Sequence, residues 1–252
     1  MTSGQQPPLK VSVCLATFNG EAYVEEQVRS ILNELGGSDE LVIVDDASTD
    51  GTVDIVREVK DRRVRLIRNA ANRGHVLTFE RALREASGSR ILLSDQDDVW
   101  LPGRLHTFVP LLAGSVPAVA ATAFLSFPDS EGFLNDDEER LTALRNGGGL
   151  RDLTLLMVGR QPYFGCAMGM NRKAVELALP FPAYVEAHDH WIAIVGIASG
   201  GIRKSDEPTV ARRLHSNNLT PTRRRSTAAR LETRAVMARM YLEAKRRLKN
   251  AS

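Results

Sequence analysis

The sequence predicts an α/β fold built on a mostly parallel, Rossmann-like sheet with helices on both faces. Over the first 95 residues, short apolar runs alternate with segments in which apolar residues recur every three to four positions. This alternation of strand and helix patterns is typical of a parallel sheet. Polar and acidic residues follow several of the apolar runs directly. Because ligands bind such sheets at the carboxyl ends of the strands, we expect the functional site there.

Four apolar runs in the first half are expected to be strands, with three amphipathic helices between them. The second run is apolar throughout, as expected of a strand that helices cover on both faces. Glycines follow the first and third helical patterns and mark where these helices end. The predicted strands are residues 10–16, 41–44, 64–67 and 90–94, and the predicted helices are residues 21–35, 53–60 and 75–86.

The second half of the chain is less regular. Residues 128–149 are polar, acidic and rich in glycine, which indicates a mobile insertion or lid. The predicted helices are 104–113, 150–158, 172–178, 188–199 and a long amphipathic one over 226–249, and the predicted strands are 118–127, 164–170 and an edge strand over 208–214. We therefore expect a flexible N-terminus (1–9), one domain (10–220) and a basic C-terminal helical extension (221–252).

The composition is that of a globular protein with a sizeable core: 252 residues, 43% hydrophobic and 25% charged. A net charge of +2 does not indicate a nucleic-acid partner. The charge is uneven, because residues 202–252 hold 14 Lys and Arg against 4 Asp and Glu, a net +10 that leaves −8 for the rest. A basic tail on an acidic body is typical of contact with membrane headgroups, a phosphorylated acceptor or an acidic partner, although a solvated basic helix has the same pattern.

The cysteine content and the apolar runs bear on location. Cys14 and Cys166 lie in apolar surroundings and form neither a disulfide framework nor a zinc pattern, which fits a reducing cytoplasm. The first ten residues do not have the pattern of a signal peptide. The longest apolar run, residues 191–202, is too short to span a bilayer. We expect a cytoplasmic protein with peripheral contact at the inner face of the membrane through its basic helix.

Three carboxylates within four residues follow the fourth predicted strand: Asp95, Asp97 and Asp98. Like charges this close repel one another unless a cation neutralises them. Hard divalent cations such as Mg²⁺ and Mn²⁺ prefer oxygen ligands and often bridge to substrate phosphates. The motif therefore predicts a metal–diphosphate site, and the alternative is a solvated acidic turn.

Three further groups of residues are candidates for function, and each has a structural alternative. Asp45 and Asp46 follow the second strand and can accept hydrogen bonds from a base or a ribose, or can stabilise a turn and cap a helix. Asp189 opens a helix between two histidines and suits a general base, or an N-cap. His215 follows the last strand, beside Arg213, and suits a metal or phosphate contact, or a structural role.

Four segments resemble the family 2 glycosyltransferases with the GT-A fold, most closely the rhamnosyltransferase-like subgroup. The resemblance covers about residues 10–220 and is most specific in the first hundred. The segments are Ala-Thr-Phe-Asn-Gly-Glu (16–21), Val-Asp-Asp-Ala-Ser-Thr-Asp-Gly-Thr (44–52), Asn-Arg-Gly (72–74) and Ser-Asp-Gln-Asp-Asp-Val-Trp (94–100), with His-Asp-His-Trp (188–191) later.

The resemblance implies an inverting transfer of a sugar from a nucleotide-diphosphate donor, dTDP-rhamnose or a UDP-sugar, to an acceptor hydroxyl. The acceptor would be a glycan or a lipid-linked sugar in cell-surface polysaccharide synthesis. Residues 10–100 would be the nucleotide-binding half and 101–220 the acceptor-binding half, with Asp189 as the general base. Asp97, Asp98 and His215 would bind Mn²⁺ or Mg²⁺. The implied nucleotide-sugar contacts are Thr17, Asn19, Glu21, Asp45, Asp46, Arg73, Asp95, Gln96 and Arg213.

The chain departs from that subgroup near its last motif, where Tyr-Arg-Gln-His-Gly is usual. Arg212, Leu214 and Ser216 stand in place of the Tyr, Gln and Gly. Two other classes stay open: a degenerate nucleotide-sugar-binding or scaffold protein, and a sugar nucleotidyltransferase. The latter is expected to carry a glycine-rich phosphate loop after the first strand, and residues 16–20 lack one. A dinucleotide dehydrogenase is disfavoured because no G-x-G-x-x-G follows that strand.

Overall fold

The computed structural model of the protein describes residues 10–128, 140–142, 144, 148–161, 163–215 and 227–251. The expected flexible N-terminus and most of the expected insertion over 128–149 lie outside these residues. So does Ser216 at the end of the last motif. None of the helices within them has both the length and the apolar character needed to cross a bilayer.

The described strands form one nine-stranded sheet in the order β3-β2-β1-β4-β8-β6-β9-β5, with β7 paired to β6. The first four strands of this order run parallel, and β8 joins them antiparallel to β4. The sheet is thus mixed but mostly parallel in its first half, as predicted. The strands are β1 Val11–Thr17, β2 Glu40–Asp45, β3 Val64–Arg68, β4 Arg90–Ser94, β5 Val99–Trp100, β6 Val119–Pro128, β7 Arg140–Thr142, β8 Met168–Asn171 and β9 Arg203–Leu214.

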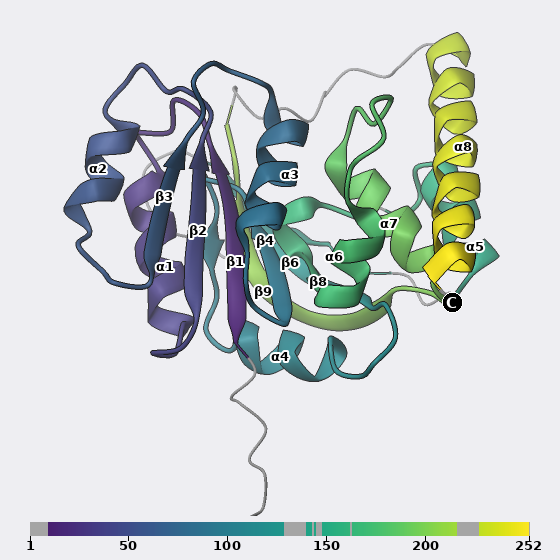
Figure 1. Ribbon diagram of the computed structural model, residues 1–252, viewed down its shortest axis with the longest axis horizontal. Coiled ribbons are helices and arrows are strands. Elements are labelled where there is room, and N and C mark those ends of the chain that lie inside the picture. Colours follow the sequence, from purple (N-terminus) through teal and green to yellow (C-terminus); the bar gives the residue numbers. More distant parts are fainter. Residues whose placement is uncertain are drawn as a thin grey trace, which may run out of the picture.

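Helices cover both faces of the sheet (Figure 1). The α8 helix stands at the side of the molecule that lies opposite β3. One apolar core joins the sheet to α3, α6 and α7, and a second joins its other face to α1, α2 and α4. The α8 helix adds Met237, Met240 and Ala244 to the first core, as expected of its apolar residues. The helices are α1 Val24–Glu34, α2 Thr52–Glu58, α3 His75–Glu85, α4 Arg104–Leu111, α5 Leu150–Met157, α6 Arg172–Ala178, α7 His188–Ala198 and α8 Thr227–Ala251.

Continuous burial explains why the sequence predicts β1 and β2 correctly. All six residues of β2 are buried, and in β1 all but one are. Strands covered on both faces select apolar residues at every position, so they appear as unbroken apolar runs. The predicted α/β fold is therefore confirmed, and the carboxyl ends of β1, β2 and β4 lie at one edge of the sheet.

Three predictions about individual elements are wrong. The expected edge strand over 208–214 begins at Arg203 and is covered on both sides, by β6 and by the unpredicted two-residue β5. Pro208 suggested an edge because it cannot donate a ladder hydrogen bond, but here it coincides with a shift in the register of β6 and β9. The expected strand over 164–170 opens with a 3₁₀ turn, Gly165–Ala167, and the first helix begins at Val24 rather than at residue 21.

Candidate active site

The carboxyl ends of β1, β2 and β4 meet because these strands are parallel neighbours. Thr17 at the end of β1 is in register with Asp45 at the end of β2. On the other side of β1, Leu15 is in register with Ser94, so the acidic segment 95–98 follows directly above it. The topology thus brings the three predicted segments to one edge of the sheet.

The side chain of Gln96 joins the acidic segment to the loop after β1. Its Oε1 accepts hydrogen bonds from Thr17 Oγ1 at 2.6 Å and from the backbone N–H of Phe18 at 2.8 Å. A Cβ at position 20 would lie 2.3 Å from this Oε1, so Gly20 is required for the close approach. Two predicted nucleotide-sugar contacts, Thr17 and Gln96, are therefore bonded to each other.

Asn19 and Glu21 connect the loop after β1 to the turn after β2. Asn19 adopts a positive φ of 48°, and its Oδ1 accepts a hydrogen bond from the backbone N–H of Thr49 at 2.9 Å. Glu21 Oε2 accepts from the backbone N–H of Gly51 at 2.7 Å, at the start of α2. A carboxylate at this position satisfies an N–H that the helix leaves unpaired and interacts favourably with its dipole.

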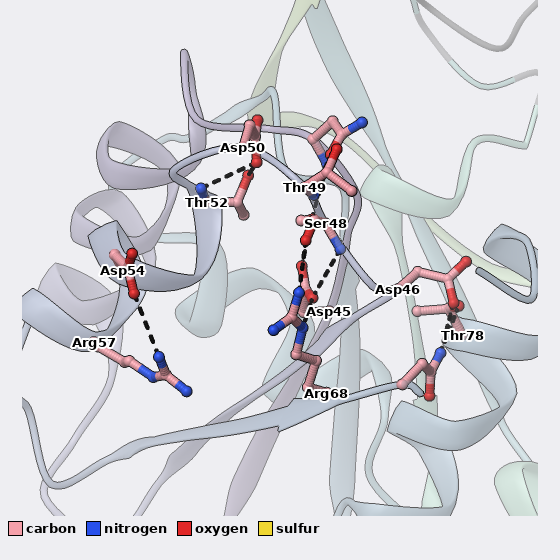
Figure 2. Close-up of polar contacts among 12 residues, drawn as sticks. Asp45, Asp46, Ser48, Thr49, Asp50, Thr52, Asp54, Arg57, Arg68 and Thr78 are labelled. Atoms are coloured by element: carbon pink, nitrogen blue, oxygen red, sulfur yellow. Dashed lines mark hydrogen bonds and ion pairs between the residues drawn. The ribbon is translucent and has the colours of Figure 1, made fainter. Parts of the chain in front are cut away.

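Asp45 holds the turn that follows β2. It is fully buried, and it accepts hydrogen bonds from both the backbone N–H and the hydroxyl of Ser48. Arg68 Nε at the end of β3 lies 3.4 Å from Asp45 Oδ1. Figure 2 shows these contacts among the residues of the turn.

Asp46 binds a different segment, the loop between β3 and α3. Its carboxylate accepts hydrogen bonds from Asn69 Nδ2 at 2.6 Å, from Arg73 N at 3.0 Å and from Gly74 N at 2.8 Å. The side chain of Arg73 is exposed and only its backbone N–H takes part. Asp45 and Asp46 thus fix the backbone of the turn after β2 and of the loop between β3 and α3.

The acidic segment differs, because one of its carboxylates, that of Asp98, is incompletely paired. Asp98 is 2% exposed; its Oδ1 accepts from the backbone N–H of Arg213 at 3.1 Å, whereas its Oδ2 has no hydrogen-bond partner. Burial and the charge of Asp97 raise the pKa of Asp98 to about 7. Burial and the charges of Asp98 and Asp97 raise the pKa of Asp95 well above its usual range.

The carboxylates of Asp95 and Asp98 fit a hard divalent cation, whereas the Cys166 thiol beside them is a soft ligand that such an ion does not prefer. One ligand atom each from Asp95, Asp98 and Cys166 lie within 4.8 Å of one another. The unpartnered oxygen of Asp98 and the raised pKa values of both carboxyls mark a place where negative charge is uncompensated. Carboxylate oxygens are the ligands that Mg²⁺ and Mn²⁺ prefer.

The end of β9 closes over the acidic segment. His215 Nε2 lies 2.8 Å from Asp97 Oδ2, and its ring stacks on that of Tyr23, 5.0 Å between centroids. Arg213 donates from Nε to the Asp97 carbonyl at 3.2 Å and pairs with Glu26 of α1 at 2.6 Å. Of the predicted metal ligands, Asp97 and His215 are therefore in contact with each other, whereas Asp98 clusters with Asp95 and Cys166. The guanidinium of Arg213 pairs with a carboxylate of the protein.

Asp189 reaches the same site from the second half of the chain. It lies in the first turn of α7, and its charge contributes to the raised pKa of Asp95. Its Oδ1 accepts from the backbone N–H of His190 at 2.7 Å. The structure thus brings the predicted base close to the acidic segment, although 90 residues separate them in sequence.

His188, one of the two histidines that flank Asp189, does not hydrogen-bond to it, because its ring packs in the core. It stacks on Phe79, 4.0 Å between centroids, and neither ring nitrogen has a hydrogen-bond partner. Burial lowers the pKa of His188 to about 4. A Cβ on Gly165 would lie 2.5 Å from His188 Nε2, so the glycine makes room for the imidazole.

Two buried polar residues that position the acidic segment were missed. Gln27, fully buried on α1, donates to Ser94 Oγ at 2.6 Å and to the Asp95 carbonyl at 2.9 Å. Trp100 Nε1 donates to the same Ser94 hydroxyl at 3.2 Å, so Trp100 packs under the acidic loop. A glutamine within the apolar stripe of α1 was the available signal.

Arg104 is the second, and it is fully buried beneath the site. Its guanidinium lies 4.4 Å from the ring of Trp100 and donates to the Cys166 carbonyl at 2.6 Å and to Thr209 Oγ1 at 2.8 Å. Burial lowers its pKa to about 10. Arg104 therefore connects Trp100, in the first half of the chain, with Cys166 and Thr209 in the second half. No pattern in the sequence distinguishes it from the exposed arginines.

The model of a family described as "Glycosyl transferase family 2" matches residues 12–177. "UDP-Glc:alpha-D-GlcNAc-diphosphoundecaprenol beta-1,3-glucosyltransferase WfgD" of Escherichia coli is 30% identical over 102 residues, 40% of this chain and 40% of that protein. WfaP of the same organism, described by the same activity, is 34% identical over 95 residues, 38% of each. The chain aligns with about two fifths of the length of these curated relatives.

Solved structures share the fold. Staphylococcus aureus TarS 1–349 in complex with UDP-GlcNAc gives a TM-score of 0.69 at 19% identity, covering 92% of this chain and 66% of that one. The mannosyltransferase PcManGT from Pyrobaculum calidifontis, in complex with GDP-Man and Mn²⁺, gives 0.58 at 19% identity, covering 98% and 75%. At this identity the likeness shows the GT-A fold alone.

Proposed function

Because the chain belongs to glycosyl transferase family 2, we propose that it transfers a sugar from a nucleotide-diphosphate donor to an acceptor hydroxyl, with inversion at the anomeric carbon. The supporting observation is the approach of Asp189 on α7 to the acidic segment after β4. The charge of Asp189 acts on Asp95, which links a candidate base to a candidate diphosphate site. Residues 10–100 are the proposed nucleotide-binding half and residues 101–220 the proposed acceptor-binding half.

We propose that the nucleotide-binding half contributes to donor binding mainly through the fixed conformation of its loops, because many of its polar side chains bond to neighbouring loops. The hydrogen bonds among its loops fix the backbone at the ends of β1, β2 and β4. A rigid crevice lowers the entropy that a bound nucleotide-sugar and its surroundings must lose. The proposed donor contacts are Thr17, Asn19, Glu21, Asp45, Asp46, Arg73, Asp95, Gln96 and Arg213.

Asp97, Asp98 and His215 would hold a divalent metal, Mn²⁺ or Mg²⁺. A bound metal of this kind supplies Lewis-acid neutralisation of the charge that develops on a leaving diphosphate. The direct contact of His215 with Asp97 and the unpartnered oxygen of Asp98 support this set. Mn²⁺ is present in the complex of the structural neighbour PcManGT.

Asp189 is the proposed general base. Its carboxylate takes the proton of the acceptor hydroxyl as the oxygen attacks the anomeric carbon. The bond from that carbon to the diphosphate oxygen breaks on the opposite face, and the diphosphate leaves with the electron pair. One displacement of this kind inverts the configuration.

The donor we favour is a UDP-hexose. UDP-Glc is named for WfgD and UDP-GlcNAc for the TarS complex. The alternative is dTDP-rhamnose, which the resemblance of the motifs to the rhamnosyltransferase-like subgroup suggested. A lipid-linked acceptor in cell-surface polysaccharide synthesis is proposed by analogy with the diphosphoundecaprenol acceptor in the name of WfgD. The cytoplasm is the proposed compartment, since both cysteines are free thiols.

A donor panel tests this proposal. The purified protein is incubated with Mn²⁺ or Mg²⁺ and with UDP-Glc, UDP-GlcNAc, GDP-mannose or dTDP-rhamnose, and nucleoside diphosphate release is measured with and without a lipid-linked acceptor. We expect release with a UDP-sugar, and an inverted anomeric configuration in the product. Binding of nucleotide-sugars without release or transfer, from a protein that also lacks activity with every acceptor tried, would favour the scaffold alternative.

The variant Asp97→Ala, measured in the same donor panel, tests the proposed metal ligand. We expect it to lower transfer about 1000-fold, because a metal ligand acts on charge that develops in the transition state, while circular dichroism and the melting temperature change little. Wild-type turnover in this variant would contradict the assignment of Asp97. Formation of nucleotide-sugar from a sugar phosphate and a nucleoside triphosphate would favour a nucleotidyltransferase instead.

A further inference from the structure

The outward face of α8 is strongly basic. The residues of this helix that pack into the core, Met237, Met240 and Ala244, lie on its other face. Within 231–251, five basic side chains are exposed against one exposed acidic side chain, Glu232. The exposed basic residues are Arg234, Arg239, Lys245, Arg246 and Lys249. Such an excess of one sign on a helix face attracts a polyanionic surface.

Two leucines lie among these cations. Leu231 and Leu242 are 59% and 69% exposed. They are eleven residues apart, which at about 100° per residue places them within about 20° of each other around the helix. Side chains of this size gain free energy by leaving water, so their shared orientation indicates a surface that receives apolar groups.

The same face carries a hollow of 570 Å³ between α8 and the segment before α7. Arg239, Leu242, Glu243, Arg246 and Arg247 contribute to it from α8, and Glu243 pairs with both Arg246 and Arg247, so the lining is cationic on balance. Arg239 lies 3.8 Å from the ring centroid of Tyr184 on the opposite wall. Cationic groups beside an aromatic and a leucine are suited to a group that has both a phosphate and an apolar part.

We infer that this face of α8 docks on an anionic lipid bilayer, with Leu231 and Leu242 at the boundary between headgroups and acyl chains and the cations on lipid phosphates. Helices that combine Lys and Arg with exposed leucines bind in the plane of such an interface. The helix stands at the edge of the molecule opposite β3 (Figure 1), so its outer face is open to a surface. A second copy of the chain is a poor occupant, because two such faces would bring five cations against five.

The inference extends the proposed function, because a lipid-linked acceptor would be met at the same surface. Docking itself needs neither donor nor acceptor. A failure of the donor panel would therefore leave the vesicle experiment interpretable. Absence of vesicle binding would leave transfer to a water-soluble acceptor untouched.

Co-sedimentation with vesicles tests the inference. The full chain is mixed with vesicles of phosphatidylcholine alone or with added phosphatidylglycerol, at low and high salt. We expect binding only to the anionic vesicles, weakened by salt. The variant Arg234→Gln/Arg246→Gln/Lys249→Gln should bind about 100-fold more weakly, since each cation at an anionic surface contributes about 1 kcal/mol and 1.4 kcal/mol is a factor of ten.

Matched controls remove the same charge or the same apolar surface elsewhere. Arg29→Gln/Arg57→Gln/Arg84→Gln removes three cations from α1, α2 and α3, each at least half exposed, and should bind like the wild type. Leu231→Ser/Leu242→Ser should weaken binding about tenfold. The corresponding control, Leu77→Ser/Val116→Ser, changes two exposed apolar residues outside α8 and should not.

Three outcomes would overturn the inference. One is equal binding to neutral and anionic vesicles, or to neither, by a wild-type protein whose circular dichroism shows it folded. A second is equal weakening in the α8 triple variant and its control. The third is a concentration-dependent dimer in sedimentation velocity that Leu231→Ser/Leu242→Ser abolishes, which would assign the face to a second copy.

Discussion

Buried carboxylates are hydrogen-bonded differently in the loops of the proposed nucleotide-binding half and in the acidic segment beside them. Asp46 is surrounded by N–H donors from Asn69, Arg73 and Gly74. Asp98, equally buried, has one hydrogen bond and one oxygen without a partner. Both lie after strands of the same sheet, so position in the fold does not explain the difference.

The difference shows which buried carboxylate has its charge compensated by hydrogen-bond donors of the protein itself. A buried carboxylate with enough donors stabilises the fold, whereas one that lacks them costs free energy until something compensates its charge. The loops around Asp46 are therefore held by the protein itself, and we propose that the acidic segment is completed by a ligand. Of the four substitutions that follow, Asp98→Asn and Asp46→Asn test this contrast directly.

The largest effect is expected at Asp189. Asp189→Asn keeps the shape of the side chain and removes its capacity to take a proton. We expect turnover to fall about 1000-fold, within the range that a general base contributes, while the binding of the nucleoside diphosphate, measured by calorimetry, changes little. Turnover within a few fold of the wild type would rule out Asp189 as the base.

Asp98→Asn should stabilise the metal-free protein. The folded-state pKa of Asp98, about 7, lies above its ordinary value of 3.8, so its ionisation penalises folding increasingly as the pH rises from 3.8 through 7. Above about pH 7 the amide should raise the free energy of unfolding by on the order of 4 kcal/mol, the full shift at 1.36 kcal/mol per unit. Thermal melting without metal is the measurement, and added Mn²⁺ should stabilise the wild type more than the variant.

Asp46→Asn is the same chemical change and should act in the opposite direction. An amide nitrogen would face N–H donors of Arg73 or Gly74 that now bond to the carboxylate. We expect the free energy of unfolding to fall by about 3 kcal/mol, as for the loss of hydrogen bonds to a buried charge. If Asp46→Asn and Asp98→Asn shift the melting temperature in the same direction, the contrast between the two regions is wrong.

The smallest effect is a pH dependence at Glu40, which is buried at the start of β2. Burial raises its pKa, but hydrogen bonds from Ser12 and Ser87 outweigh this and lower it from 4.5 to about 2. The stability that ionised Glu40 supplies is therefore complete above pH 4.5 and is lost as the pH falls toward 2.

Glu40→Gln should remove about 2 kcal/mol of this dependence, less than the whole shift because Lys10 and Arg65 lie partly in solvent. Unfolding of both proteins in denaturant across the acid range measures it. Parallel curves for wild type and variant would show that Glu40 does not titrate as described.

Elements of the fold could be predicted from the sequence where the pattern that specifies them lies within one segment. The β2 strand is buried throughout, and α1 and α3 have apolar stripes at helical spacing, so each was legible in its own segment. The pairing of β9 with β6 and β5 was not, because it joins residues about 80 or more positions apart in sequence. Register between distant segments leaves no periodic pattern in either.

The sequence by itself determined the parallel α/β core and pointed to the polar residues from Thr17 to His215 as candidates for function. Only the tertiary structure decided how each one is used. Asp45, Asp46 and Gln96 bond to neighbouring loops, Asp98 keeps an unpartnered oxygen, and the buried Gln27 and Arg104 support the acidic segment from beneath. The physical reason is that periodicity records burial, whereas the charge and hydrogen bonding of a carboxylate depend on which distant donors the fold brings within about 3 Å of it.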